Sequence, residues 1–285
     1  MDLTLSAGEQ RFRDEIREWL EANHPGATPS SSEEEFDFRL AWQRRLHQAG
    51  YAGIAWPTEF GGRGATLVEQ TIFNEEMVRA RAPGPANILG LIMGGPLVIA
   101  HGTAEQKQRL LQPILSGDEI WCQGFSEPDA GSDLAAVRTR AERVDGGWRI
   151  SGQKVWTSYA HRASWCMLLA RSNDGERYHN LTYFICAIRQ PGVSVRPLRQ
   201  ITGDSEFNEV FFDGAFVPEE NVIGAEGDGW RMAMATLMFE RPGLGAASAL
   251  QIRMALSDVA AIIRRTGRSG DAGVRSSLGR LIATA

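Results

Sequence analysis

Apolar side chains in the first 118 residues recur at the spacing of one helical face. In the first such segment Phe12, Ile16 and Leu20 share a face, and Ser6 with Glu9 forms a capping box, which marks the start of a helix. Further helices are predicted around Phe36, Leu40 and Leu46, over Leu67 to Ala80, and after Thr103, an N-cap followed by Gln106. This pattern predicts an N-terminal helical domain.

Between residues 119 and 222 the pattern changes to short runs rich in β-branched and aromatic residues. Asp145-Gly146 lies between two such runs and is typical of a two-residue hairpin turn. Four more runs are bounded by Gly, Asp or Pro: Trp165 to Leu169, Leu181 to Ile188, Val193 to Leu198, and Glu209 to Phe212. Because these runs follow one another at short, regular spacing, we expect antiparallel strands in a sandwich or barrel, and not a parallel βαβ sheet.

Helical spacing returns in the last part of the chain. Predicted helices run from Arg231 to Phe239, from Leu250 to Arg265, and from Val274 onward. In the last of these, Val274, Leu278 and Ile282 repeat every four residues, so this stripe requires a packing partner. Neither a C-cap nor a closing turn precedes Ala285. We therefore expect a C-terminally incomplete chain, or a second polypeptide that covers the stripe.

The three regions together predict an α+β multidomain protein. Its parts are an N-terminal helical domain (1–118), a middle antiparallel β domain (119–222) and the start of a C-terminal helical-bundle domain (228–285). A length of 285 residues exceeds the usual single-domain size, and 43% apolar residues is ordinary for a globular protein. The net charge of −5 argues against nucleic acid or an anionic membrane as a partner, because both attract a basic face.

The sequence also bears on location and on metal binding. The first residues carry neither the basic nor the apolar region of a signal peptide, and the apolar stretch from Ala86 to Ala100 is too short and interrupted to span a bilayer. The three cysteines show no CxxC spacing, which predicts free thiols in a reducing compartment. We therefore expect a cytoplasmic protein without membrane insertion. The five histidines form no metal-binding pattern, so no metal site is expected.

Four ordered motifs carry the strongest functional signal. Phe125 to Asp133 (FSEPDAGSD) resembles one signature of the acyl-CoA dehydrogenase family, and Gly152 to Ser158 (GQKVWTS) resembles the second. Pro57 to Gly62 and Gly102 to Lys107 also match the family upstream. Taken alone, a tryptophan in a β domain is usually a core residue, and Ser-Glu-Pro is usually a turn. The order and spacing of all four, over essentially the whole chain, favour membership of this family.

The resemblance implies FAD as the cofactor. It assigns to flavin binding the residues Gln123, Phe125, Ser126, Trp156, Thr157 and Ser158. In the family, the residue that matches Ser158 bonds the flavin N5 region, the one that matches Ser126 bonds the pyrimidine edge, and the one that matches Trp156 lies beside the ring. Short hydroxyls and a large aromatic surface suit the edges and the flat faces of a flavin.

The same resemblance implies an acyl-CoA substrate and a catalytic base. Removing a proton from the α-carbon of a thioester requires a carboxylate that faces the flavin across the substrate. One arrangement in the family places this glutamate directly before an arginine, which matches Glu240 and Arg241. A Glu-Arg pair is otherwise most often a solvated pair on a helix surface. The resemblance also places Ser132, Leu237 and Arg241 on the substrate side, with Ser132 beside the pantetheine arm of CoA.

Two departures from the family pattern leave alternatives open. Met238 replaces an acidic residue found in many members, and the segment from Arg265 to Asp271 lacks the Phe-Gly that reaches a neighbouring subunit's FAD. The first hypothesis is a dimeric or tetrameric dehydrogenase that passes electrons to an electron-transferring flavoprotein. The second is an organising or half-site subunit of a hetero-oligomer, and the third is an acyl-CoA oxidase or flavin monooxygenase on the same fold. A visible spectrum distinguishes the second hypothesis from the other two: a colourless protein favours the second, and a stable yellow protein favours the first or the third.

Overall fold

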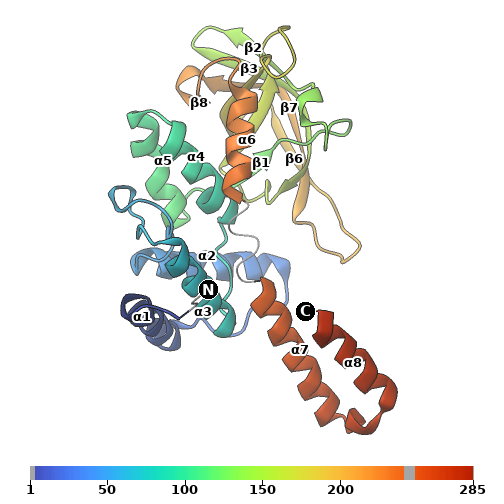
Figure 1. Cartoon of the computed structure of the whole chain (residues 1–285). Helices are drawn as coiled ribbons and strands as arrows, with labels where there is room; N and C mark the ends of the chain where they lie inside the picture. Colours follow the sequence, from blue (N-terminus) through green and yellow to red (C-terminus); the bar gives the residue numbers. More distant parts are fainter. Residues whose placement is uncertain (1–3, 241–247, 285) are drawn as a thin grey trace. The chain divides into compact units, whose positions relative to one another are not determined.

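The computed structural model of the chain describes residues 4–240 and 248–284 (Figure 1). Its α-helices are α1 (Ala7–Asn23), α2 (Ser32–Gln48), α3 (Leu67–Arg79), α4 (Gly95–His101), α5 (Ala104–Ser116), α6 (Gly229–Glu240), α7 (Ser248–Arg265) and α8 (Ala272–Thr284). Its strands are β1 (Trp121–Gly124), β2 (Arg140–Val144), β3 (Gly147–Ser158), β4 (Trp165–Arg171), β5 (Leu181–Ala187), β6 (Val193–Pro197), β7 (Phe207–Pro218) and β8 (Val222–Ile223). The predicted fold class, with helices, then a sheet, then helices, is confirmed.

The helix starts follow the local chemistry of the sequence. The Ser6 side chain accepts a hydrogen bond from the Glu9 backbone, and the Glu9 carboxylate accepts one from the Ser6 backbone, as the capping box predicts. Thr103 and Gln106 form the same arrangement at the start of α5. The predicted core helix over residues 86–100 begins as a π-helical turn at Gly90–Gly94 and continues as α4. No helix in the described part of the chain is both long and apolar enough to cross a membrane.

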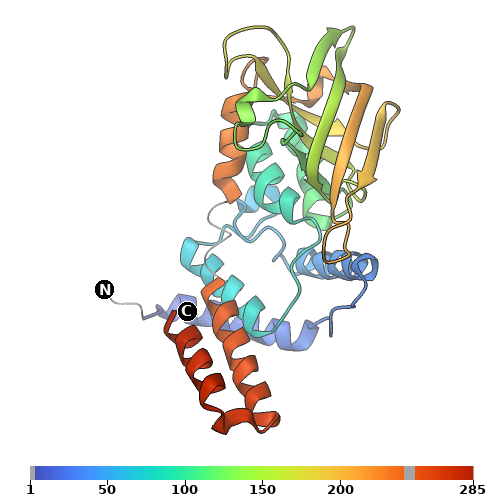
Figure 2. The same cartoon turned by 90° about the vertical axis from the view of Figure 1, so that its right-hand side faces the viewer.

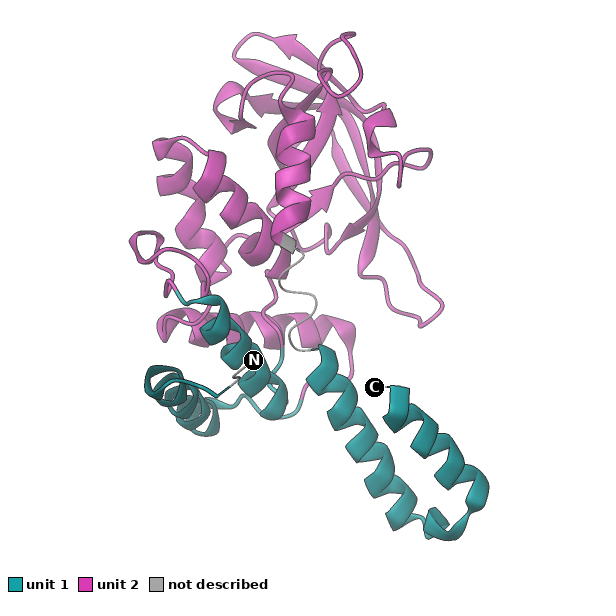
Figure 3. Cartoon of the chain, in the orientation of Figure 1, with its two compact units in different colours: residues 1–27, 65–83, 241–285 teal, residues 28–64, 84–240 magenta. Residues whose placement is uncertain are grey.

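The chain divides into two compact units (Figure 3). One comprises residues 1–27, 65–83 and 241–285, and the other comprises residues 28–64 and 84–240. The second unit therefore contains the whole sheet together with α2, α4, α5 and α6. The domain limits drawn from the sequence, at 118/119 and at 222/228, stay a prediction.

The sheet has eight strands in the order β6-β7-β3-β2-β4-β5-β8, with β1 paired to β4. Its pairings are antiparallel except for the parallel contacts of β4 with β1 and with β2. The predicted hairpin joins β2 to β3 through Asp145-Gly146, and Gly146, at the second corner, has a positive φ of 75°, which glycine adopts readily. The mainly antiparallel sheet expected from the sequence is thus present. Strand β4 is the exception, because it pairs antiparallel with β5 and parallel with β1 and β2.

Strands β4 and β5 are buried on both faces, which explains their unbroken apolar runs. Alternate residues, such as Leu168 and Phe184, pack with Trp148 of β3 and Val210 of β7. One face of the sheet therefore forms an apolar core from the side chains of its own strands. The opposite face lies against α4, α5 and α6 (Figures 1 and 2), and the π-helical turn packs there too. The side chain of Met232 on α6 is fully buried at this face. This face positions α6 along β5.

The first unit is held by α1 against α3 and carries the hairpin of α7 and α8. The carboxylate of Glu76 on α3 is 3% exposed and accepts hydrogen bonds at 2.9 and 3.0 Å from Arg17 on α1. On α8, Val274 and Leu278 are half-buried beside α7, whereas Ile282 is 57% exposed. The apolar stripe predicted from the sequence is therefore covered by α7 at its beginning and open at Ile282.

Candidate functional site

The segment that follows β1 is a tight turn anchored on the core. The Glu127 N–H donates to the Ala130 carbonyl at 2.8 Å, and the Ala130 N–H donates to the Glu127 carbonyl at 3.1 Å. Pro128 lies at the first corner, where its fixed φ suits a turn. Phe125 is 5% exposed and belongs to the cluster beneath the helices. This anchor leaves Ser126 half-buried at the edge of the core.

A buried ion pair joins the two predicted signature segments. The Lys154 Nζ, on a fully buried side chain of β3, donates to Glu127 Oε1 at 2.8 Å and to the Phe125 carbonyl at 2.9 Å. Glu127 also accepts from the backbone N–H of Thr139 at 2.9 Å and of Arg138 at 2.6 Å. Every oxygen of this carboxylate is therefore used, which is what makes a buried charge tolerable.

The protonation of this pair follows from its surroundings. Burial by itself raises the pKa of the Glu127 carboxyl, but the Lys154 charge and the hydrogen bonds outweigh burial and hold that pKa below the usual 4.5. Burial lowers the pKa of the Lys154 ammonium, and the Glu127 carboxylate offsets part of this effect. Glu127 is thus a carboxylate at neutral pH, and it holds the Lys154 ammonium at the Phe125 carbonyl.

A bulge in β3 turns Trp156 outward. Lys154 pairs with Val210 and Thr157 with Asn208, so two residues of β3 oppose a single residue of β7. Trp156 has a φ of 59°, in the left-handed region that non-glycine residues seldom adopt, and it is 61% exposed. The exposure excludes the core role that a lone tryptophan in a β domain would suggest. The bulge leaves a large aromatic face open to a ligand.

Among the described residues, buried polar side-chain atoms without a partner lie on β1 and β3. Gln123 Nε2 and Thr157 Oγ1 are buried and have no hydrogen-bond partner in the described part of the chain. The Val155 N–H donates to the Ser126 carbonyl at 2.9 Å, which links the segment after β1 directly to the bulge. Ser126 and Ser158 are half-buried. Because buried polar atoms are normally bonded, Gln123 and Thr157 mark places where a ligand can supply the partner.

The remaining predicted residues lie on other elements. Ser132 is exposed in the loop before β2, and Leu237 is half-buried on α6, where it packs against the core. Glu240 is the last residue of α6. Arg241 lies outside the described residues, as does the placement of the Glu240 side chain. Among the residues that the structure describes, no three His, Cys, Asp or Glu side chains are grouped so that they could hold a metal ion.

Sequence reasoning did not single out Glu127 and Lys154, although both lie within the quoted motifs. The available signal was a charged residue in each motif next to positions expected to be buried, since a buried charge requires an opposite partner. Gly152, in the second motif, also has a structural role, which is to allow a close approach of two strands. A Cβ at this position would lie 2.7 Å from the Thr139 Cα, so only glycine allows β3 to pass so close to the start of β2.

Comparison with known proteins relates this geometry to one family. The family described as "Acyl-CoA dehydrogenase, N-terminal domain" matches residues 6–118, and "Acyl-CoA dehydrogenase, middle domain" matches residues 122–215. Acyl-CoA dehydrogenase IpdE1 of Mycobacterium tuberculosis is 45% identical over 280 residues, which cover 95% of this chain and 73% of that protein.

Two solved structures are similar along nearly the whole chain. The structure described as "Tcur3481-Tcur3483 steroid ACAD" aligns with a TM-score of 0.85 at 29% identity, over 99% of this chain and 74% of the other. The ChsE4-ChsE5 complex from Mycobacterium tuberculosis aligns with a TM-score of 0.83 at 28% identity, with the same coverage of 99% and 74%.

Proposed function

This chain belongs to the acyl-CoA dehydrogenase family of oxidoreductases, and we propose that it desaturates an acyl-CoA thioester between the α and β carbons using FAD. The observation that carries the proposal is the contact between the two signature segments of the chain. Ser126 and Val155 are hydrogen-bonded, and Trp156 is turned outward directly beside them. Bound FAD supplies an acceptor for the hydride that leaves the β-carbon.

The residues present fit such a cofactor. Trp156 offers an exposed aromatic face, and the Ser126 and Ser158 hydroxyls can bond polar ring edges. Gln123 Nε2 and Thr157 Oγ1 are the buried polar atoms that still require a partner. The role of Lys154 in this proposal is to hold the Phe125 carbonyl, and with it the segment that carries Ser126.

On the substrate side, the proposal assigns proton removal to Glu240. A carboxylate at the end of α6 takes the α-proton, and α6 is fixed in place because Met232 and Ala233 are buried against the sheet. Leu237 lies on the same helix and contributes apolar surface beside the acyl chain. Ser132 is assigned to the pantetheine arm of CoA, and Arg241 to the substrate side of the base.

The visible spectrum of the purified protein, followed by anaerobic mixing with acyl-CoAs, tests this function. We expect a yellow protein whose flavin absorbance bleaches with at least one thioester in a panel of graded length, branching and ring content. A steroid-derived acyl-CoA belongs in the panel, because one similar structure is described as a steroid enzyme. Failure to bind FAD under any condition would refute the proposal. Hydrogen peroxide formation in air would instead identify an oxidase, and reduction of an electron-transferring flavoprotein a dehydrogenase.

A two-subunit enzyme is a second candidate, and the comparisons favour it. One similar structure is described as the ChsE4-ChsE5 complex, and the description of the other joins two names, Tcur3481 and Tcur3483. In this version the chain contributes part of an FAD site that a different subunit completes. Purification from the native source, with intact mass and flavin content per chain, distinguishes the two candidates. A homo-oligomer with one FAD per chain excludes the shared site, whereas a second polypeptide in equal amount with half that flavin content supports it.

A further inference from the structure

One buried hydroxyl contact attaches the end of α6 to the sheet. The Thr236 hydroxyl, on α6, donates to the Tyr183 hydroxyl oxygen, on β5, at 3.2 Å, and it also lies 2.8 Å from the Met232 carbonyl. Tyr183 and Thr236 are both 0% exposed, and Thr236 is the one buried polar side chain among residues 229–239 of the helix. Because a hydrogen bond is directional, this contact specifies the position of α6 on β5 more narrowly than apolar packing does.

A second attachment lies at the start of the same helix. A Cβ on Gly229 would lie 2.6 Å from backbone atoms of both Leu181 and Thr182, so only glycine lets α6 begin this close to β5. Gly229 and Thr236 are seven residues apart, which places them on one face of the helix, about two turns from each other. The helix is thus fixed to a single strand at its first residue and again at Thr236.

The same tyrosine also contacts the segment that follows β1. The rings of Tyr183 and Phe125 are 5.8 Å apart at an interplanar angle of 87°, an edge-on arrangement that aromatic pairs favour. The Phe125 carbonyl is held by Lys154, and the next residue is Ser126, which the proposed function assigns to the flavin. One side chain therefore touches both the flavin-facing segment and the helix that ends at Glu240.

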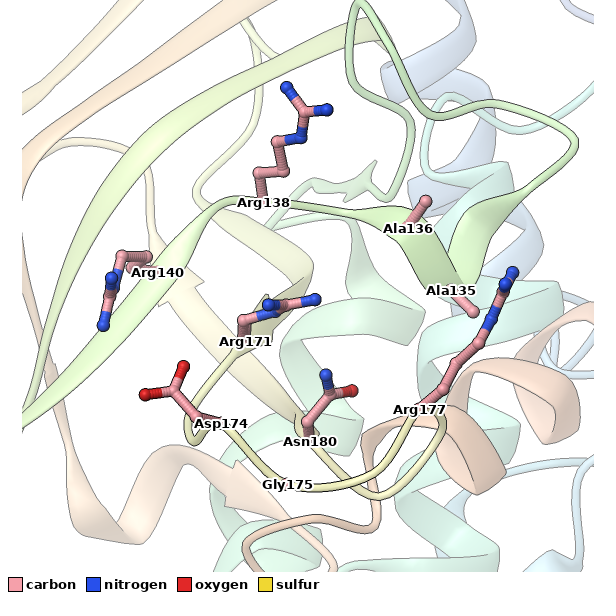
Figure 4. A pocket seen from close by; sticks show the side chains of 9 residues that line it. All are labelled: Ala135, Ala136, Arg138, Arg140, Arg171, Asp174, Gly175, Arg177 and Asn180. Atoms are coloured by element: carbon pink, nitrogen blue, oxygen red, sulfur yellow. The ribbon is translucent and has the colours of Figure 1, made fainter.

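Tyr183 and Thr236 act on their neighbours and not on a ligand. Strand β5 begins beside a cavity of about 680 Å³ that is lined by Arg171, Arg177 and Asn180, among others (Figure 4). Neither Tyr183 nor Thr236 lines this cavity. Burial raises the pKa of the Tyr183 hydroxyl above its usual 10, so this group stays protonated at neutral pH and cannot serve as a base. A side chain that protein covers on all sides can affect a reaction only through the position of its neighbours.

We propose that Tyr183 is a positioning residue, which sets the place of the last turn of α6 relative to the segment that carries Ser126. Under the proposed function, on which this assignment rests, that turn ends at the base Glu240 and that segment faces the flavin. Glu240 follows Thr236 by four residues, so about one helical turn separates the base from the hydroxyl contact. Proton removal depends steeply on the distance between base and carbon, because the reacting atoms must be held close together. Loss of the hydroxyl should therefore slow the reaction without weakening ligand binding.

Hydrogen–deuterium exchange of the full chain, without FAD or substrate, tests the positioning. Tyr183→Phe keeps the ring and its contact with Phe125, so the hydroxyl alone is lost. Backbone amides of residues 237–239 should exchange roughly three- to tenfold faster, the effect of one lost hydrogen bond, while the amides of α5 exchange as in wild type. The matched control is Trp148→Phe, which removes a donor to Glu219 at 3.1 Å in the other core cluster. Unchanged exchange at 237–239 in Tyr183→Phe, or equal acceleration there in Trp148→Phe, would overturn the proposal.

Flavin reduction by an acyl-CoA measures the consequence for the reaction. In FAD-loaded Tyr183→Phe the limiting rate should fall ~10–100-fold, while the dissociation constant of the acyl-CoA and the flavin content per chain stay unchanged. Trp148→Phe should show the wild-type rate, and Tyr183→Phe combined with Thr236→Val should be no slower than either alone, since both remove one contact. A wild-type rate in Tyr183→Phe, or a multiplied loss in the double variant, would refute the assignment. If no thioester reduces the wild-type flavin, the proposed function fails, whereas exchange at 237–239 still decides whether Tyr183 fixes the helix end.

Discussion

Trp156 combines exposure with an unfavourable backbone conformation. Its φ of 59° costs free energy for any residue with a Cβ, and the residue is 61% exposed, so it contributes little to the core. The conformation persists because Lys154 and Thr157 on either side are fully buried. Strain that packing enforces at an exposed aromatic residue is most simply explained by ligand binding.

Trp156→Ala is expected to impair FAD retention while leaving the apoprotein folded. The substitution removes an edge-on contact with Phe207 at 6.1 Å, which contributes less than about 1.5 kcal/mol. Trp148→Ala is the matched control, because Trp148 is 1% exposed and its loss should cost ~3–5 kcal/mol. Urea unfolding and flavin content per folded molecule measure both effects. Equal destabilisation by the two variants would show that Trp156 is a core residue and would contradict its proposed role in FAD binding.

Glu240→Gln should remove the proposed base without disturbing cofactor binding. A lost general base lowers the rate of flavin reduction by ~10²–10⁴-fold, and anaerobic stopped-flow mixing with a good substrate measures it. Glu142→Gln, at an exposed position on β2, serves as the control and should reduce at the wild-type rate. Near-normal bleaching in Glu240→Gln would contradict the assignment.

At the scale of elements, the site depends on joining the segment after β1 to β3. The Lys154–Glu127 pair and the Ser126–Val155 hydrogen bond connect segments far apart in the sequence. Lys154→Met should destabilise the protein by ~3–5 kcal/mol, because it leaves the Glu127 carboxylate buried and unpaired. Adding Glu127→Gln should restore part of this loss, and a double-mutant cycle from urea unfolding gives the coupling.

A control variant at another lysine, together with a measurement of FAD affinity, distinguishes a positioning role of Lys154 from a contribution to stability alone. Lys107→Met removes a cation 5.7 Å above the Phe60 ring and should cost less than about 1 kcal/mol. If Lys154 positions the flavin-facing segment, the folded fraction of Lys154→Met should also bind FAD more weakly than Lys107→Met does. Unaltered FAD affinity would limit Lys154 to a structural role.

The same pair predicts a pH dependence of stability. Because the Glu127 pKa is lower in the folded protein than its usual 4.5, the unfolded chain binds more protons as the pH falls below that value. The stabilisation is therefore complete above pH 4.5 and is lost as the pH falls through the folded-state pKa. Urea unfolding from about pH 6 to about pH 3 should show a steeper decline for wild type than for Glu127→Gln. Parallel curves would show that Glu127 does not carry this effect.

At the scale of the whole molecule, cofactor binding should increase the free energy of unfolding of the protein. A ligand that binds only the folded chain raises the free energy of unfolding by ~2.7 kcal/mol at a hundredfold excess over its dissociation constant. Adding FAD to apoprotein should therefore raise the melting temperature, and Trp156→Ala should reduce the shift. Riboflavin, which lacks the ADP moiety of FAD, is the control and should give a smaller shift. An absent FAD shift in the isolated chain, restored by a second polypeptide, would favour the two-subunit candidate.

Where the sequence predicted the structure well, the signal was local. Capping boxes at Ser6 and Thr103 and the Asp145-Gly146 turn depend on residues within a few positions of each other, so their chemistry can be recognised without the fold. The motif segments were located in the same way. What local pattern could not give was the bulge at Trp156, since it is defined by the pairing of β3 with β7.

The sequence by itself determined the order of helices and strands, the turn chemistry and the motifs that indicate a flavin-dependent acyl-CoA dehydrogenase. Only the tertiary structure decided that Lys154 is paired with Glu127, that Trp156 faces outward, and that Tyr183 contacts Thr236. The physical reason is the range of the interactions. Helix periodicity and turns are set by near neighbours, whereas charge pairing and exposure depend on strand register and packing between distant segments.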